Sequence, residues 1–78
     1  MPRYFLHLEV YGRLVEDPEG EEFSGVAAAR GAALKAAREI MSNRVFQGKP
    51  ANGGRFLITD DARNVVSEVF FEEAISGR

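Results

Sequence analysis

The sequence predicts an α+β domain of two layers, in which one long helix packs on one face of a three- or four-stranded antiparallel sheet. Three observations carry this prediction. Apolar side chains alternate near the start, an alanine-rich stretch with helical periodicity follows, and two strand-like runs joined by a short polar turn come last. The element order is therefore strand, short strand, helix, strand, strand. At 78 residues the chain has room for one domain, which we expect to span residues 1–78.

The first strand is expected over residues 4–11, because bulky side chains alternate there with a period of two. One face carries Tyr4, Leu6, Leu8 and Val10, and the other carries Phe5, His7, Glu9 and Tyr11. Gly12 and Arg13 are expected to turn the chain into a short return strand at Leu14 and Val15.

An acidic segment covers the next residues, with carboxylates at Glu16, Asp17, Glu19, Glu21 and Glu22. Pro18 presets φ and Gly20 tolerates positive φ, so the segment is expected to turn. Its spacing is not that of a calcium-binding loop. We interpret it as a solvated loop, with contact to a basic partner as the alternative.

The long helix is expected from about Gly25 to Phe46, with Ser24 as its N-cap and Gly48 and Pro50 as its stop. At 100° per residue one side collects Val26, Ala29, Ala33, Ala37, Ile40 and Met41, flanked by Leu34 and Ala36. This alanine-rich side should face the sheet and approach it closely. The basic side chains Arg30, Lys35, Arg38 and Arg44 are spread around the helix and are expected to be solvated.

Two further strands are expected at residues 55–60 and 65–71, joined by a turn over residues 60–64. Asp60 and Asp61 suit turn-forming hydrogen bonds, with a divalent-cation site as a weaker alternative. Both faces of the last strand are apolar, so the pattern leaves open which face is inward. The last residues, from Glu72 on, form a helical turn or fray.

Composition excludes several classes of protein. The chain has no cysteine, hence no disulfide framework and no thiolate metal site. Its net charge of −2 disfavours sequence-independent binding to nucleic acid. No run has the length of a membrane span, and the start lacks the apolar core of a signal peptide. We therefore expect a cytoplasmic protein with no nucleic-acid or membrane partner.

The sheet face away from the helix is the expected interaction surface. A two-layer domain leaves that face uncovered, and monomers rarely expose large apolar patches. The residues expected to contact a partner there are Phe5, His7, Tyr11, Leu57, Val66 and Phe70. A second copy, forming a homodimer, is the first expectation, and a different small protein partner is the alternative.

His7 is the single histidine and the first place to look for chemistry. Glu9 lies on the same strand face, so the two side chains could touch, as an acid–base pair would require. One histidine without cysteine is too few ligands for a typical zinc site. We expect His7 to be a contact residue whose charge responds to pH, and we expect no catalytic, cofactor-binding or metal-binding residues and no enzyme activity.

Several motifs together resemble a family of short bacterial proteins. They are the opening MPRYFLH, the DPEG turn, the helix AAARGAALKAAREIM and the closing RFLITDDARNVVSEVFF. Members are common in rhizobia and related alphaproteobacteria, typically open with MPRYFFH, and are catalogued as a domain of unknown function. The resemblance implies a fold unit and a cytoplasmic location without assigning any residue a role. The family's glycine before the last strand is Asn64 here, and Asn also tolerates the left-handed conformation.

The element layout is also similar to that of antitoxin domains of the HicB type, although no diagnostic motif accompanies it. Two functional hypotheses follow. The first is a non-enzymatic protein–protein interaction module that associates with itself through the uncovered sheet face. The alternative is an antitoxin-like or other regulatory module that binds a protein partner, with the acidic segment as its recognition surface.

Overall fold

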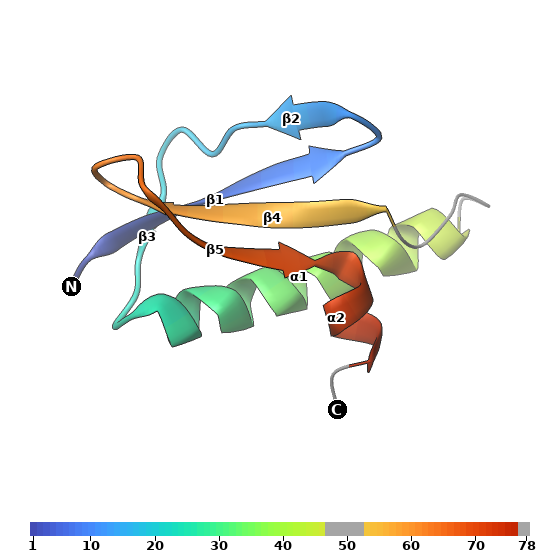
Figure 1. The fold of residues 1–78 in the computed structure, drawn as a ribbon. Coiled ribbons are helices and arrows are strands. Elements are labelled where there is room, and N and C mark those ends of the chain that lie inside the picture. The colour runs from blue at the N-terminus through green and yellow to red at the C-terminus, as the bar shows by residue number, and fades with distance from the viewer. Residues whose placement is uncertain (47–52, 77–78) are drawn as a thin grey trace.

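The computed structural model describes residues 1–46 and 53–76, and Figure 1 shows their arrangement. The elements are β1 (Arg3–Val10), β2 (Arg13–Val15), β3 (Glu21–Glu22), α1 (Val26–Phe46), β4 (Gly54–Asp60), β5 (Val65–Phe70) and α2 (Phe71–Ser76). The predicted α+β class is confirmed. The helix stop expected at Gly48 and Pro50 lies outside the described residues.

The sheet is antiparallel throughout, with strand order β2-β1-β4-β5. Its fifth strand, β3, pairs with the start of β1 on the edge that β2 uses further along. The prediction of a solvated loop over residues 16–22 was therefore wrong at Glu21 and Glu22. Two consecutive acidic residues lack the apolar alternation that predicts a strand. They form one because they lie beside the start of β1 and pair with it.

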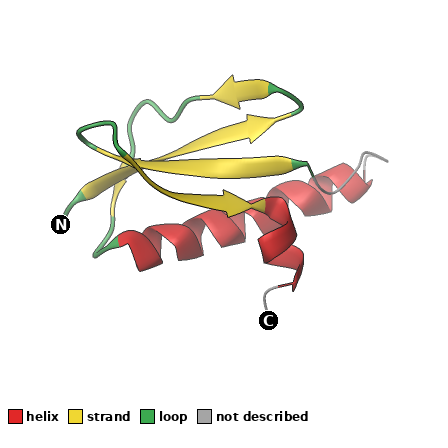
Figure 2. Ribbon diagram, in the orientation of Figure 1, coloured by secondary structure: helices red, strands yellow, loops and turns green. Residues whose placement is uncertain are grey.

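α1 crosses one face of the sheet, and α2 packs beside it near the end of β5 (Figure 2). The predicted apolar side of α1 is confirmed, since Ala29, Ala33 and Ala37 are fully buried and Met41 nearly so. Against them lie the buried side chains of the sheet and of α2, namely Tyr4, Phe56, Ile58, Val69, Phe71 and Ala74. Alanine lets the helix approach the sheet closely, but it contributes little apolar area to the core.

The inward face of β5 is settled by Val69, which is fully buried, and by Phe71 directly after the strand. Ser67 lies opposite Ile58, whereas Val65 lies opposite Thr59, so Val66 is the extra residue of a β-bulge. Glu68 and Phe70 consequently point away from α1. The sequence left both orientations open, because both faces of the strand carry apolar side chains.

Several element ends lie one residue from the predicted positions, and two of these differences concern a turn and a helix cap. The first hairpin turns at Tyr11 and Gly12, which have φ of 53° and 74°, the signs that a two-residue type I′ turn requires. β1 therefore ends at Val10, one residue before Tyr11. The N-cap of α1 is Gly25, whose carbonyl accepts from the N–H of Ala29, so the assignment of Ser24 was wrong.

Arg30 was expected to be solvated and instead joins three elements. Its Nη1 donates to Ser67 Oγ at 2.7 Å and to the Glu68 carbonyl at 2.9 Å, and its Nη2 pairs with Glu73 Oε1 at 2.8 Å. Glu73 in turn accepts from the N–H of Phe70 at 3.0 Å, which is half of a capping box for α2. This Arg30–Glu73 clasp occupies backbone groups of β5, an edge strand that could otherwise pair with another chain.

We predict that Arg30→Ala lowers the free energy of unfolding by roughly 1–2 kcal/mol, because it removes hydrogen bonds from a charged donor. Arg38→Ala is the matched control, since Arg38 is exposed on the same helix, and its effect should stay within about 0.5 kcal/mol. Urea denaturation followed by circular dichroism measures both. Equal losses in the two variants would contradict the clasp.

Candidate functional site

The sheet face turned away from α1, here called the open face, is organised by cross-strand pairing. In the first row Leu14 faces Glu9, Glu9 faces Arg55 and Arg55 faces Phe70. In the second row His7 faces Leu57, which faces Glu68, and in the third Phe5 faces Thr59. Directly opposed side chains lie on the same face of a sheet, so these residues from four strands form one surface.

An ion cluster occupies the middle of the first row. Arg55 Nε lies 2.5 Å from Glu9 Oε1, and Arg55 Nη1 lies 2.9 Å from Glu68 Oε1. The hydrogen bond to Glu9 is the main cause that raises the pKa of Arg55 above its usual value. Glu9 is thus committed to Arg55 and does not orient His7 as a general base would need. A hollow of about 400 Å³ adjoins this cluster, lined in part by Glu9, Arg55 and Phe70.

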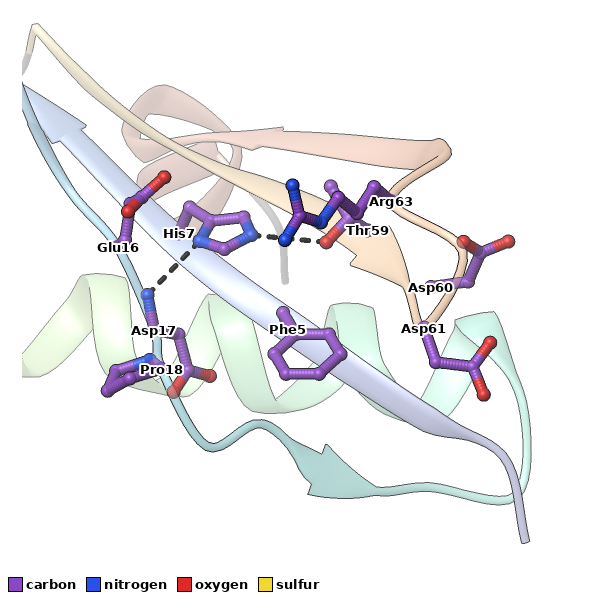
Figure 3. A pocket seen from close by; sticks show the side chains of 9 residues that line it. All are labelled: Phe5, His7, Glu16, Asp17, Pro18, Thr59, Asp60, Asp61 and Arg63. Atoms are coloured by element: carbon purple, nitrogen blue, oxygen red, sulfur yellow. Dashed lines mark hydrogen bonds between the residues drawn. The ribbon is translucent and has the colours of Figure 1, made fainter.

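A larger groove of about 630 Å³ lies at the other end of the open face (Figure 3). Its floor consists of Phe5 and His7 from β1 and Thr59 from β4. One wall is the segment Glu16–Pro18, and the other is the β4–β5 turn with Asp60, Asp61 and Arg63. The rings of Phe5 and His7 lie nearly parallel, 6° apart with centroids separated by 6.3 Å.

Both ring nitrogens of His7 are engaged. The N–H of Asp17 donates to Nδ1 at 3.1 Å, so Nδ1 carries no proton in this arrangement. Nε2 then carries the ring proton and donates to Thr59 Oγ1 at 3.1 Å. His7 in this neutral tautomer connects the wall segment to β4, and neither nitrogen is open to a substrate.

Asp17 lies between β2 and β3, where the middle of β1 has no strand partner on that edge. Its Oδ2 accepts from the N–H of Leu6 at 3.2 Å, and Oδ1 accepts from Glu19 and Gly20 at 3.3 and 3.1 Å. Burial raises the pKa of this carboxyl, but the hydrogen bonds from Gly20, Leu6 and Glu19, together with nearby His7, lower it by more. The carboxylate therefore acts as the missing strand partner of β1 and holds the wall in place.

The opposite wall is built by Asp60. Its Oδ1 accepts from the N–H groups of Ala62 and Asn64, each at 2.9 Å, which confirms the predicted turn-forming hydrogen bonds for Asp60. The same prediction was wrong for Asp61, whose side chain makes no such bond with the described residues. The Asn64 backbone is the main cause that lowers the pKa of Asp60. The left-handed residue of the turn is Arg63, with φ of 68°, and Asn64 does not adopt that conformation. Within residues 1–46 and 53–76 no cluster of three metal-ligating side chains occurs.

A family described as Domain of unknown function (DUF6894) matches residues 3–72. The chain belongs to the DUF6894 family. The matched span runs from the start of β1 into α2 and includes every residue that lines the groove. Curated proteins and solved structures give no match. The alphaproteobacterial origin expected from the opening heptad stays a prediction.

In this DUF6894 domain the six residues expected at an interface divide into three groups. Phe5 and His7 line the groove, and Leu57 lies half-buried on the open face next to His7. Phe70 is 45% exposed at the end of the first row, and Val66 lies in the bulge of β5. Tyr11 lies in the β1–β2 turn, away from the paired positions of the open face. Their role in an interface stays a prediction.

Sequence reasoning missed the contacts of Asp17, Thr59 and Arg55, and it missed the place of Arg63 in the groove wall. The β4 partners of His7 and Glu9 lie 52 and 46 residues away, so local spacing gives no sign of them. Alternation in residues 55–60 places Leu57 and Thr59 on the face away from the helix, and the same alternation adds Arg55 to that face. Among the described residues no helix is long and apolar enough to cross a membrane.

The hydrogen bonds of Asp17 predict a defined dependence of stability on pH. Its pKa is lower in the folded chain than the unfolded value of 3.8, so its stabilisation is complete above that value and is lost as pH falls below it. Asp17→Asn should lower the free energy of unfolding by about 1–3 kcal/mol at neutral pH, and the difference from wild type should shrink below pH 3.8.

Urea denaturation across the pH range measures this difference, and subtraction of the variant from wild type removes the contributions of Asp60 and Glu73, whose pKa values are also lowered. Glu19→Gln, two residues along in the same loop, is the control and should leave stability nearly unchanged. A pH-independent difference for Asp17→Asn would show that the ionised carboxylate is not the source.

Gly20 limits how closely the wall approaches the floor. A Cβ there would lie 2.8 Å from the Phe5 ring and 2.8 Å from the Tyr4 carbonyl, and φ is 68°. Gly12 has a similar φ of 74° with nothing within 4 Å, so it shares the backbone strain without the clash. Gly20→Ala should therefore destabilise by more than Gly12→Ala, whose cost is about 1–2 kcal/mol. Thermal unfolding of the two variants compares them directly, and equal melting temperatures would refute the close contact.

Proposed function

We propose that this domain is a non-enzymatic protein–protein interaction module that forms a homodimer through the end of the open face that carries the ion cluster. The proposal rests on the exposure of apolar side chains on a sheet face that neither of the two described helices covers. Leu14 and Phe70 are 51% and 45% exposed at the two ends of the first row, with Leu57 half-buried between the strands.

The small core supports the same proposal. Of the described residues, only Phe71, Ile58 and Val69 are large side chains that are fully buried, and most of the helix face is alanine. Domains of this size are marginal when isolated, and burial of further apolar area in a dimer is a common remedy. Self-association would cover Leu14, Leu57 and Phe70 without disturbing the contacts of α1.

The dimensions of the domain predict a weak dimer. Its Cα atoms extend over 38 × 28 × 16 Å, so the whole broad face offers at most about 1,000 Å² and the ion-cluster end only part of that area. Stable interfaces bury about 800 Å² on each partner, so an interface confined to this end belongs to the weak, transient class. The ion cluster is no obstacle, because Arg55 already pairs with Glu9 and Glu68 within one copy. Charged groups that enter an interface paired cost less to bury than unpaired ones.

The test is the oligomeric state of matched variants. We predict that the wild type sediments as a dimer at high micromolar concentration and that Phe70→Asp weakens the dimer roughly tenfold, as expected for loss of an aromatic contact from the first row. Ile75→Asp is the control, because Ile75 is 61% exposed on α2, away from the open face, and should leave the dimer intact.

Analytical ultracentrifugation over a concentration series measures all three proteins. A wild type that stays monomeric throughout would refute self-association. Dissociation by Ile75→Asp and not by Phe70→Asp would place the interface elsewhere.

A further inference from the structure

The groove at the other end of the open face combines a flat aromatic floor with acidic walls. Phe5 and His7 are half-buried, so their nearly parallel rings are held in place and still reach the groove. The wall residues Glu16, Asp61 and Arg63 are exposed around them. The volume of about 630 Å³ accommodates a side chain together with the backbone that carries it.

The net charge of the residues that line the groove favours a cationic ligand. Four carboxylates, those of Glu16, Asp17, Asp60 and Asp61, face one guanidinium, that of Arg63, which gives a net charge of −3 with His7 neutral. Fields of one sign in a concave site attract ligands of the opposite charge. Anionic ligands, including phosphate groups, are therefore disfavoured even though an arginine is present.

Some of the charged side chains in the groove already make hydrogen bonds within the domain, and others do not. Asp17 and Asp60 hold the two walls through backbone hydrogen bonds. In contrast, the side chains of Glu16, Asp61 and Arg63 make no hydrogen bond or ion pair with any residue that the structure describes. Figure 3 shows the Phe5 ring between Asp17 and Asp61, while Arg63 reaches back over Thr59 and His7. A cation above Phe5 would thus have a carboxylate on each side.

We propose that the groove binds an arginine side chain on an extended segment of a partner protein. The planar guanidinium stacks on Phe5 and donates to Asp61 and to the remaining lone pair of Asp17, and Arg63 donates to a backbone carbonyl of the segment. Arginine suits the site better than lysine, because only a planar guanidinium can stack on the ring and bridge two carboxylates. This site is distinct from the proposed dimer surface at the ion-cluster end.

The experiment is a titration of the ¹⁵N-labelled domain with the peptide acetyl-Gly-Arg-Gly-amide, followed by amide chemical shifts. The expected result is saturable shifts at Phe5, His7, Asp61 and Arg63, weakened by salt, with a Lys peptide weaker and a citrulline peptide, which is planar but neutral, nearly inactive. Phe5→Leu keeps an apolar side chain and removes the π face, so binding should weaken about two- to fivefold. Asp61→Asn should weaken it as well.

Glu39→Gln is the matched control, since it removes an exposed carboxylate from α1 and should not change binding. Phe70→Asp should bind the peptide like the wild type, which separates this proposal from the dimer. Shifts spread over all surface carboxylates, or equal binding of the citrulline peptide, would overturn the proposal. Amide chemical shifts of groove residues that change with protein concentration alone would mean that a second copy fills the groove, and this result would also overturn the proposal.

Discussion

The pairing of β1 with β4 is the constraint on which both ends of the open face depend. Seven residue pairs run from Tyr4 opposite Asp60 to Val10 opposite Gly54. This register alone brings Phe5 to Thr59, His7 to Leu57 and Glu9 to Arg55. A shift by one residue would turn Phe5 and His7 toward α1 and Leu6 and Leu8 toward solvent. The packing of Tyr4, Ile58 and Phe56 against the alanines of α1 therefore also determines which side chains lie on the open face.

Side chains from distant parts of the chain occupy backbone groups of the sheet at two places. Asp17 replaces a strand partner of β1 in the interval between β2 and β3. At the β5 edge, Arg30 and Glu73 occupy the Glu68 carbonyl and the Phe70 N–H. Backbone groups occupied in this way do not invite strand addition, so at these positions a partner has more to gain from side chains on the open face than from backbone pairing.

The elements were predictable from sequence because they depend on periodicity, which is local. Alternation located β1 and β4, and the spacing of Ala29, Ala33 and Ala37 identified the buried side of α1. The contacts of single polar residues were not predictable, because their partners are set by register and by turns. Arg30 forms hydrogen bonds with Ser67 and Glu73, which lie 37 and 43 residues away. His7 forms hydrogen bonds with Asp17 and Thr59 and not with nearby Glu9. Likewise, the pairing of Val69 with buried Phe56 decides which face of β5 is inward.

The groove and the stability of the fold share the same groups. The wall segment is held by the carboxylate of Asp17 and by Nδ1 of His7, and both contacts depend on protonation: Asp17 must be ionised and Nδ1 must lack a proton. Because Glu16 and Pro18 flank Asp17, the contacts that stabilise this segment also position one wall of the groove. The register of β1 and β4 positions its floor, since Phe5, His7 and Thr59 lie on those two strands. His7 joins the wall to the floor through both of its ring nitrogens.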